Sequence, residues 1–218
     1  MPIPTLIDGW SRFRAGRFRE QRELFARLRE GQRPQFAMIA CCDSRSDPAI
    51  VFDCDPGDLF VIRNVANLVP PYEQAGSYHG TSAAIEFAVA VLGVKHVVVL
   101  GHARCGGITA LLADALADTA ELPFVSAWMG LARPALAAAL AAPASEGEAR
   151  QLLCEQHAIR LSLQNLQSFP WIRERIDRGA LTLHGWHFDF RDGALSLLDR
   201  RKDRFRPAVP AAEAGGDA

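Results

Sequence analysis

The sequence predicts an α/β fold with a mainly parallel central sheet, flanking helices, an N-terminal helical arm and a C-terminal hairpin. Two short apolar runs, 36–40 and 97–100, are continuous rather than alternating, which is typical of strands buried on both faces of a parallel sheet. Apolar residues recur at helical spacing over 81–92, directly before the second run. This segment predicts the crossover helix of a right-handed β-α-β unit.

The length and composition favour one domain that buries a substantial core. The 218 residues carry a net charge of -1, which does not suggest nucleic acid or an anionic membrane as a partner. No apolar stretch approaches the ~18 residues that a membrane-spanning helix needs. The N-terminus lacks the apolar core of a secretory signal, and five cysteines fit reduced thiols, so we expect a cytoplasmic protein. We assign 1–206 to the domain, with 1–31 as a helical arm, and expect 207–218 to be disordered.

The arm, from Thr5 to Glu30, is expected to form one or two helices, with possible breaks at Gly9 and Gly16. Large apolar residues recur at helical spacing with arginines between them. Because the arm has little of its own chain to pack against, we expect it to lie on a partner subunit. The alternative is a helix on the surface of its own domain.

The middle of the chain contains strands and short helices in alternation. Asp47 is expected to cap a short helix that begins at Pro48, and a turn at 56–58 leads into a strand at 59–62. The helix at 81–92 and the strand at 97–100 follow, and then a helix over 108–116.

The C-terminal half is mostly helical before its hairpin. We expect short helices over 116–145 and a long helix over 148–167, capped by Ser145 with Glu148 three residues on. A helix over 170–178 ends at Gly179. Strands at 181–190 and 194–198 form a hairpin that turns at Asp192-Gly193, and its first strand is expected to join the sheet edge.

Metal-binding side chains follow both apolar runs. Cys41-Cys42-Asp43-Ser44-Arg45 comes directly after the first, and Gly101-His102-Ala103-Arg104-Cys105-Gly106-Gly107 after the second. Ligands of open α/β sheets bind at the carboxyl ends of the strands. If the two strands are neighbours, Cys41 or Cys42 can meet His102 and Cys105 at one point.

Thiolate and imidazole are the ligands of tetrahedral zinc sites, and a site with three protein ligands keeps its fourth position open for catalysis. Two other interpretations remain. Asp43 could be a fourth ligand that closes a structural zinc site, or the cysteines could pair in a disulfide. Asp43 and Arg45 are two residues apart, so in extended chain they leave on the same side and the guanidinium can hold the carboxylate bidentately. A plain structural ion pair is the alternative.

The two motifs resemble those of the β-class carbonic anhydrases, Cys-x-Asp-Ser-Arg and Gly-His-x-x-Cys-Gly-Gly. The segments 60–71 and 80–87 are also similar to that family, and the match is collinear from about Gln32 to Leu112. The resemblance implies one zinc per chain, held by Cys41, His102 and Cys105, with Cys42 not a ligand. It also implies hydration of carbon dioxide to bicarbonate and a proton by zinc-bound hydroxide.

The resemblance assigns further roles. Asp43, held by Arg45, would accept a hydrogen bond from the zinc-bound water. The residues expected to contact the substrate are Gln32, Phe60, Val65, Phe87 and Gly106. The N-terminus of the helix that begins near Gly106 favours an anion such as bicarbonate. The pocket is expected at a subunit interface, so the protein would be a homodimer or a dimer of dimers.

Some family members close the site by moving Asp43 onto zinc. Those members carry a Trp and a Tyr where this chain has Met38 and Phe188, and only Arg63 of their bicarbonate-binding trio remains. Gln32 instead matches the plant-type branch. We therefore expect an open site with water or a small anion on zinc.

Two thiolates cancel the charge of the ion, so activity is expected to rise into the mildly alkaline range. The alternatives are hydrolysis of carbonyl sulfide or carbon disulfide on the same site, and a non-catalytic zinc protein that senses bicarbonate.

Overall fold

The computed structural model describes residues 2–74, 79–115, 121–143 and 146–209. The chain divides into two compact units, Met1–Arg33 and Pro34–Ala218. The first unit contains helices α1 (Ile3–Ala15), α2 (Arg17–Glu20) and α3 (Arg22–Leu28), none of which has a buried residue among those described. The break predicted at Gly16 is confirmed, whereas the one at Gly9 is wrong because Gly9 lies inside α1.

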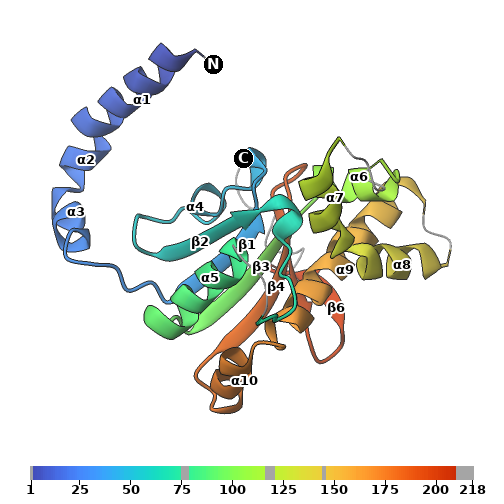
Figure 1. Cartoon of the computed structure of the whole chain (residues 1–218). Helices are drawn as coiled ribbons and strands as arrows, with labels where there is room; N and C mark the ends of the chain where they lie inside the picture. The colour runs from blue at the N-terminus through green and yellow to red at the C-terminus, as the bar shows by residue number, and fades with distance from the viewer. Residues whose placement is uncertain (1, 75–78, 116–120, 144–145, 210–218) are drawn as a thin grey trace. The chain divides into compact units, whose positions relative to one another are not determined.

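The second unit is built on a six-stranded sheet with the order β2-β1-β3-β4-β5-β6 (Figure 1). Four strands are parallel, β1 (Phe36–Cys41), β2 (Leu59–Asn64), β3 (His96–His102) and β4 (Thr182–Asp189). The predicted hairpin is formed by β4 and the antiparallel β5 (Ala194–Asp199). The predicted fold class is therefore confirmed.

The sheet continues beyond the predicted hairpin. Strand β4 joins β3 at the edge of the parallel strands, as predicted, and strand β6 (Arg204–Pro207) pairs antiparallel with β5 and forms the outer edge of the sheet. The backbone N–H of Ala208 also donates to Leu195 at 2.8 Å. Order therefore extends past residue 206, where we expected the tail to begin, and 210–218 lie outside the described residues.

Helices connect the strands much as the sequence indicates. They are η1 (Ser44–Ser46), α4 (Pro48–Val51), η2 (Val65–Asn67), α5 (Gly80–Glu86), η3 (Phe87–Val91), α6 (Gly106–Leu112), α7 (Pro123–Gly130), α8 (Arg133–Ala141), α9 (Gly147–Leu166) and α10 (Pro170–Asp177). Asp47 caps α4 by accepting from the Ala49 N–H at 3.0 Å, as predicted. The N-cap of α9 is Glu146 rather than Ser145, which lies outside the described residues. The predicted crossover helix is α5 followed by η3, a single π-helical turn.

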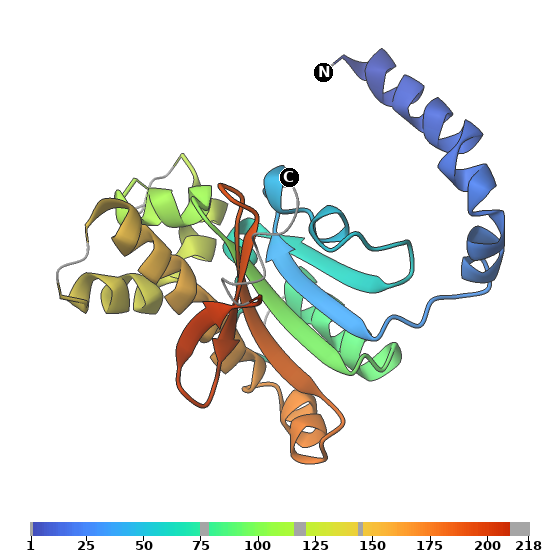
Figure 2. The same ribbon diagram turned by 180° about the vertical axis from the view of Figure 1, so that it is seen from behind.

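The larger part of the core lies between one face of the sheet and the helices α5 and α9, which Figures 1 and 2 show on the same side. Alternate residues of β1 and β3 face this side, and the others form a smaller cluster on the opposite face with Phe52, Trp186 and Phe188. Both faces of the central strands are thus buried, which explains their unbroken apolar sequence.

Helix α9 lies directly against β3 and β4 because both strands carry a glycine beneath it. A methyl group at Gly101 would lie 2.7 Å from Ile159 Cδ1, and one at Gly185 would lie 2.8 Å from Ile159 Cγ2. Any side chain at either position would push the helix away from the sheet. The two glycines thus fix the distance between α9 and the strand that ends at His102.

Among the described residues, no single helix combines the length and apolarity needed to cross a bilayer. The helices α7 and α8 reach that length and apolarity only when they are taken together, and a bend of 57° separates them.

Candidate metal centre

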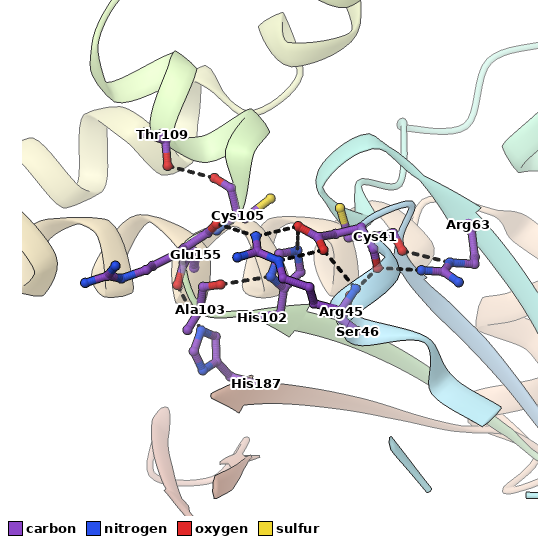
Figure 3. Close-up of polar contacts among 12 residues, drawn as sticks. Cys41, Arg45, Ser46, Arg63, His102, Ala103, Cys105, Thr109, Glu155 and His187 are labelled. Carbon is purple, nitrogen blue, oxygen red and sulfur yellow. Dashed lines mark hydrogen bonds and ion pairs between the residues drawn. The ribbon is translucent and has the colours of Figure 1, made fainter. Parts of the chain in front are cut away.

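The two strand ends that carry the motifs are neighbours in the sheet. Strand β1 ends at Cys41 and β3 ends at His102, and their register places Ala40 beside Leu100. Cys105 occupies the N-cap position of α6. Ligand atoms of Cys41, His102 and Cys105 all lie within 4.8 Å of one another, and the three residues are buried. Figure 3 shows the two cysteines reaching this point from opposite sides, with His102 between them.

The orientation of His102 leaves one ring nitrogen available to a metal. Its Nδ1 lies 2.9 Å from the Ala103 carbonyl oxygen, which can only accept, so Nδ1 carries the proton. The buried Nε2 has no hydrogen-bond partner in the part of the chain that the structure describes. A buried unpaired nitrogen is costly, and coordination to a cation would remove that cost. With two thiols beside it, the donor set fits zinc.

The cysteines separate into ligands and bystanders. All five are free thiols, so the disulfide interpretation is not supported. Cys41 and Cys105 are buried in the cluster, whereas Cys42, one residue past the end of β1, is exposed. Strand alternation explains the choice between the adjacent cysteines, since only one of two successive side chains can face the site.

The two buried thiols favour a single shared negative charge. The neighbouring Cys105 lowers the pKa of Cys41, and Cys41 in turn raises the pKa of Cys105. Burial acts to lower the pKa of His102, but the adjacent Cys41 and the Ala103 carbonyl raise it overall. A divalent cation would displace the proton that the thiols retain, because thiolate is the form that binds metal.

Asp43 is held beside the cluster by Arg45. The guanidinium donates from Nε to Oδ1 at 2.9 Å and from Nη2 to Oδ2 at 2.7 Å, and the Arg45 backbone N–H donates to Oδ1 at 3.0 Å. These hydrogen bonds to Arg45 hold the pKa of Asp43 well below its usual range. Asp43 Oδ2 is 4.0 Å from His102 Nε2, so the carboxylate borders the metal position. The Arg45 guanidinium also lies over the Phe190 ring, 4.3 Å from its centroid.

Arg63 has a structural task that the sequence did not indicate. Its Nε donates to the Cys41 carbonyl at 2.9 Å, its Nη2 donates to the Asp43 carbonyl at 2.6 Å, and its Nη1 pairs with Asp47 at 2.5 Å. The residue therefore fastens the segment that carries the first ligand and the carboxylate.

Two further residues at the centre are not indicated by any pattern in the sequence. Glu155 on α9 accepts from the Cys105 backbone N–H at 3.0 Å and contacts His187 Nε2 at 2.9 Å. Both side chains are buried, and Figure 3 shows them on the Cys105 side of the cluster. No local pattern connects Glu155 to the motifs, because only the packing of α9 brings it there.

The residues predicted to contact substrate come from different elements of the chain, and each is described by its own surroundings. Gln32 is an exposed residue of the first unit, and Gly106 is the exposed first residue of α6. Phe60 and Phe87 stack on one another with centroids 5.9 Å apart. Val65 lines a mostly apolar cavity of about 680 Å³ together with Cys42, Asn64, Pro70, His79, Gly80, Thr81, Ser82, Phe124, Val125, Ala127, Trp128 and Leu131.

Known proteins are similar to this chain in fold and in sequence. The sequence profile of the family described as carbonic anhydrase matches residues 36–195. A carbonic anhydrase of Pseudomonas aeruginosa is 39% identical over 201 residues, covering 92% of this chain and 89% of the relative. The solved β-carbonic anhydrase CcaA superposes with a TM-score of 0.88 at 35% identity, covering 96% of this chain and 93% of that one. One of two tetrameric β-carbonic anhydrases from Sordaria macrospora superposes with a TM-score of 0.76 at 30% identity, covering 89% and 95%.

The fold and the site define an α/β protein with a buried Cys-His-Cys cluster at the carboxyl edge of its parallel strands. Together with these similarities, they show that the chain belongs to the β-class carbonic anhydrase family and is an enzyme.

Proposed function

We propose that the protein catalyses the reversible hydration of carbon dioxide with one zinc ion held by Cys41, His102 and Cys105. The observation that carries this proposal is the buried His102 Nε2, which has two thiols beside it and no hydrogen-bond partner among the described residues. Zinc bound there would act as a Lewis acid and supply a water-derived nucleophile near neutral pH. Membership of the carbonic anhydrase family supports carbon dioxide as the substrate.

Asp43 and Arg45 are proposed to orient the reacting water. An ionised carboxylate can only accept hydrogen bonds, so Asp43 can take one from water but cannot donate one. Arg45 occupies both carboxylate oxygens on one side, which fixes the direction of the remaining lone pairs. The same contacts keep Asp43 from becoming a fourth ligand. The observed pairing therefore supports an open, plant-type site.

The substrate needs an apolar approach because carbon dioxide carries no charge and no hydrogen-bond donor. Val65 lines the cavity described above, which also reaches Cys42, the neighbour of the first ligand. Trp128 Nε1 donates to the Val65 carbonyl at 2.8 Å and so fixes that wall. We propose that this cavity admits substrate.

A homodimer is the proposed minimum active unit. In the first unit, apolar side chains including Leu6 and Trp10 are 58% and 54% exposed. In the second unit, Val61 on the edge strand β2 is 39% exposed, and Phe87 and Val91 are 45% and 66% exposed. A surface that exposes several large apolar side chains favours association between chains. Sedimentation should show a dimer or larger for the full chain and a smaller species after deletion of residues 2–31. A monomeric full chain would contradict this part of the proposal.

The catalytic proposal is tested by stopped-flow hydration of carbon dioxide, run beside assays with carbonyl sulfide and carbon disulfide. The wild-type protein should hydrate carbon dioxide rapidly, and a Cys105→Ser variant should not. Turnover of only the sulfur analogues would replace the substrate while leaving the site intact. A zinc-loaded protein without any of the three activities would point to a bicarbonate-sensing role and would refute the enzyme mechanism proposed above.

A further inference from the structure

We infer that Glu155 and His187 form a buried positioning pair that fixes the Cys105 side of the metal centre. The inference rests on the proposed zinc site and concerns how the chain holds one of its ligands. Neither residue belongs to the two sequence motifs, and neither side chain is among the metal donors.

The pair is almost completely shielded from solvent and is joined by hydrogen bonds to Cys105 and Gln151. The side chains of His187 and Glu155 are 4% and 3% exposed. Glu155 Oε1 accepts from the Cys105 backbone N–H and from Gln151 Nε2, both at 3.0 Å. Glu155 Oε2 lies 2.9 Å from His187 Nε2, which must be the donor because a carboxylate only accepts.

Two features of the fold bring these groups to the metal centre. Gly101 and Gly185 allow α9 to lie directly on β3 and β4, and Ile159 is the residue that fills the contact. Glu155 is one turn before Ile159 on the same face of α9, so it reaches the carboxyl end of β3. The register of β4 places His187 beside Gly101, one residue before the ligand His102.

The contact acts on a turn that is unfavourable for its sequence. His102 and Cys105 are joined by a tight turn in which Arg104 has a φ of 52°, a left-handed conformation that non-glycine residues rarely adopt. The Ala103 N–H donates to Phe188 at 2.9 Å, and the Arg104 side chain pairs with the exposed Glu148. Cys105 is the last residue of this turn, and Glu155 accepts a hydrogen bond from its backbone N–H. This contact fixes the backbone position from which the Cys105 side chain reaches the metal centre.

A buried carboxylate and imidazole are a costly way to fill space, since apolar residues of the same size often serve stability equally well. Their value lies instead in a directional hydrogen bond to a ligand residue. Groups that orient metal ligands in this way typically change metal affinity by roughly 10–100-fold when removed. A core residue without such a contact affects affinity only by unfolding the protein.

The test compares variants of the full chain by zinc affinity, measured through competition with a chelator at one fixed pH. Glu155→Leu removes the acceptor, and Glu155→Gln keeps an acceptor oxygen for the Cys105 N–H. Leu166→Ala on the same helix is the structural control, because it opens the buried core away from the turn. Glu174→Gln on α10 is the control for loss of an exposed carboxylate. Circular dichroism establishes that each variant is folded.

We expect Glu155→Leu to bind zinc roughly 10–100-fold more weakly than wild type and Glu155→Gln to recover most of that loss. Both controls should keep wild-type affinity. In the cobalt-substituted protein, the thiolate-to-cobalt absorption band should change in Glu155→Leu and not in Leu166→Ala. His187→Leu should weaken binding by itself but add nothing to Glu155→Leu, because it acts through the same carboxylate.

Wild-type zinc affinity in folded Glu155→Leu would overturn the inference, as would a Glu155→Gln variant no better than Glu155→Leu. An equal loss in Leu166→Ala would also overturn it. If Glu155→Leu does not fold, the zinc affinity of His187→Leu is compared with that of Leu166→Ala instead. Equal zinc affinities in these two variants would refute the positioning role of Glu155 and His187. Failure of the proposed zinc site would appear separately. In that case Cys105→Ser would bind zinc as tightly as the wild-type protein does.

Discussion

Replacing Gly101 with alanine should destabilise the protein because α9 lies too close to β3 for any side chain at that position. The added methyl group would lie 2.7 Å from Ile159 Cδ1 and 2.9 Å from Ile159 Cγ1. Ile159 is completely buried, so its side chain cannot turn aside into solvent. Inserting a methyl group into a filled core costs about 1–3 kcal/mol of unfolding free energy. For a chain of this size, we expect the unfolding temperature to fall by roughly 2–12 °C.

The clash predicts a specific rescue. Ile159→Ala alone should cost about 2–5 kcal/mol through the cavity that it leaves. The double variant should be more stable than the sum of the two single costs implies, by about 0.5–3 kcal/mol, because the new methyl group fills part of that cavity. Gly130→Ala is the matched control, since its added methyl group would meet no described atom within 4 Å beyond its chain neighbours and the backbone of its own helix.

The assay is thermal and urea unfolding followed by circular dichroism, with zinc and protein concentration held fixed because both bias the equilibrium. An unchanged unfolding temperature for Gly101→Ala would refute the close approach of α9. Strict additivity in the double variant would refute the assignment of the clash to Ile159.

Three further predictions concern the site. Asp43→Asn should lower kcat/KM for carbon dioxide by roughly 10²-fold at unchanged zinc content, because an amide loses an acceptor that orients the reacting water; equal stopped-flow rates would contradict this. Arg45 depresses the pKa of Asp43, so the ionised carboxylate stabilises the fold above the unfolded pKa of about 3.9 and that contribution is lost as pH falls. The urea midpoint of wild type should therefore drop further between pH 6 and pH 3 than that of Asp43→Asn, and parallel curves would refute the linkage. Chelation should abolish hydration and lower the unfolding temperature of wild type reversibly, whereas Cys105→Ser should show no shift; a shift of equal size in that variant would place the zinc elsewhere.

The parts of the site that could be predicted are those encoded by adjacent residues. Cys41 and His102 each end a strand, and a parallel sheet brings the carboxyl ends of neighbouring strands to one edge, so their convergence follows from local patterns. The Asp43–Arg45 pair spans only three residues and was likewise accessible. The choice of Cys41 over Cys42 needed the resemblance, and the structure accounts for it by strand alternation.

The parts that could not be predicted depend on tertiary packing. Glu155 is 50 positions beyond Cys105 and reaches it only because α9 rests on two glycines. His187 could not be assigned to the site either, since the register that places it beside Gly101 is not visible in the sequence. Strand β6 was missed because Arg-Phe-Arg-Pro is short and charged, which is how an edge strand avoids further pairing.

Zinc held by Cys41, His102 and Cys105 is proposed to make this chain a carbon dioxide hydratase. The most direct measurement is a titration of the metal-free protein with zinc, in which each step is followed by stopped-flow hydration of carbon dioxide. Activity should rise in proportion to added zinc and stop rising at about one ion per chain. Full zinc occupancy with hydration no faster than that of Cys105→Ser would contradict this proposal.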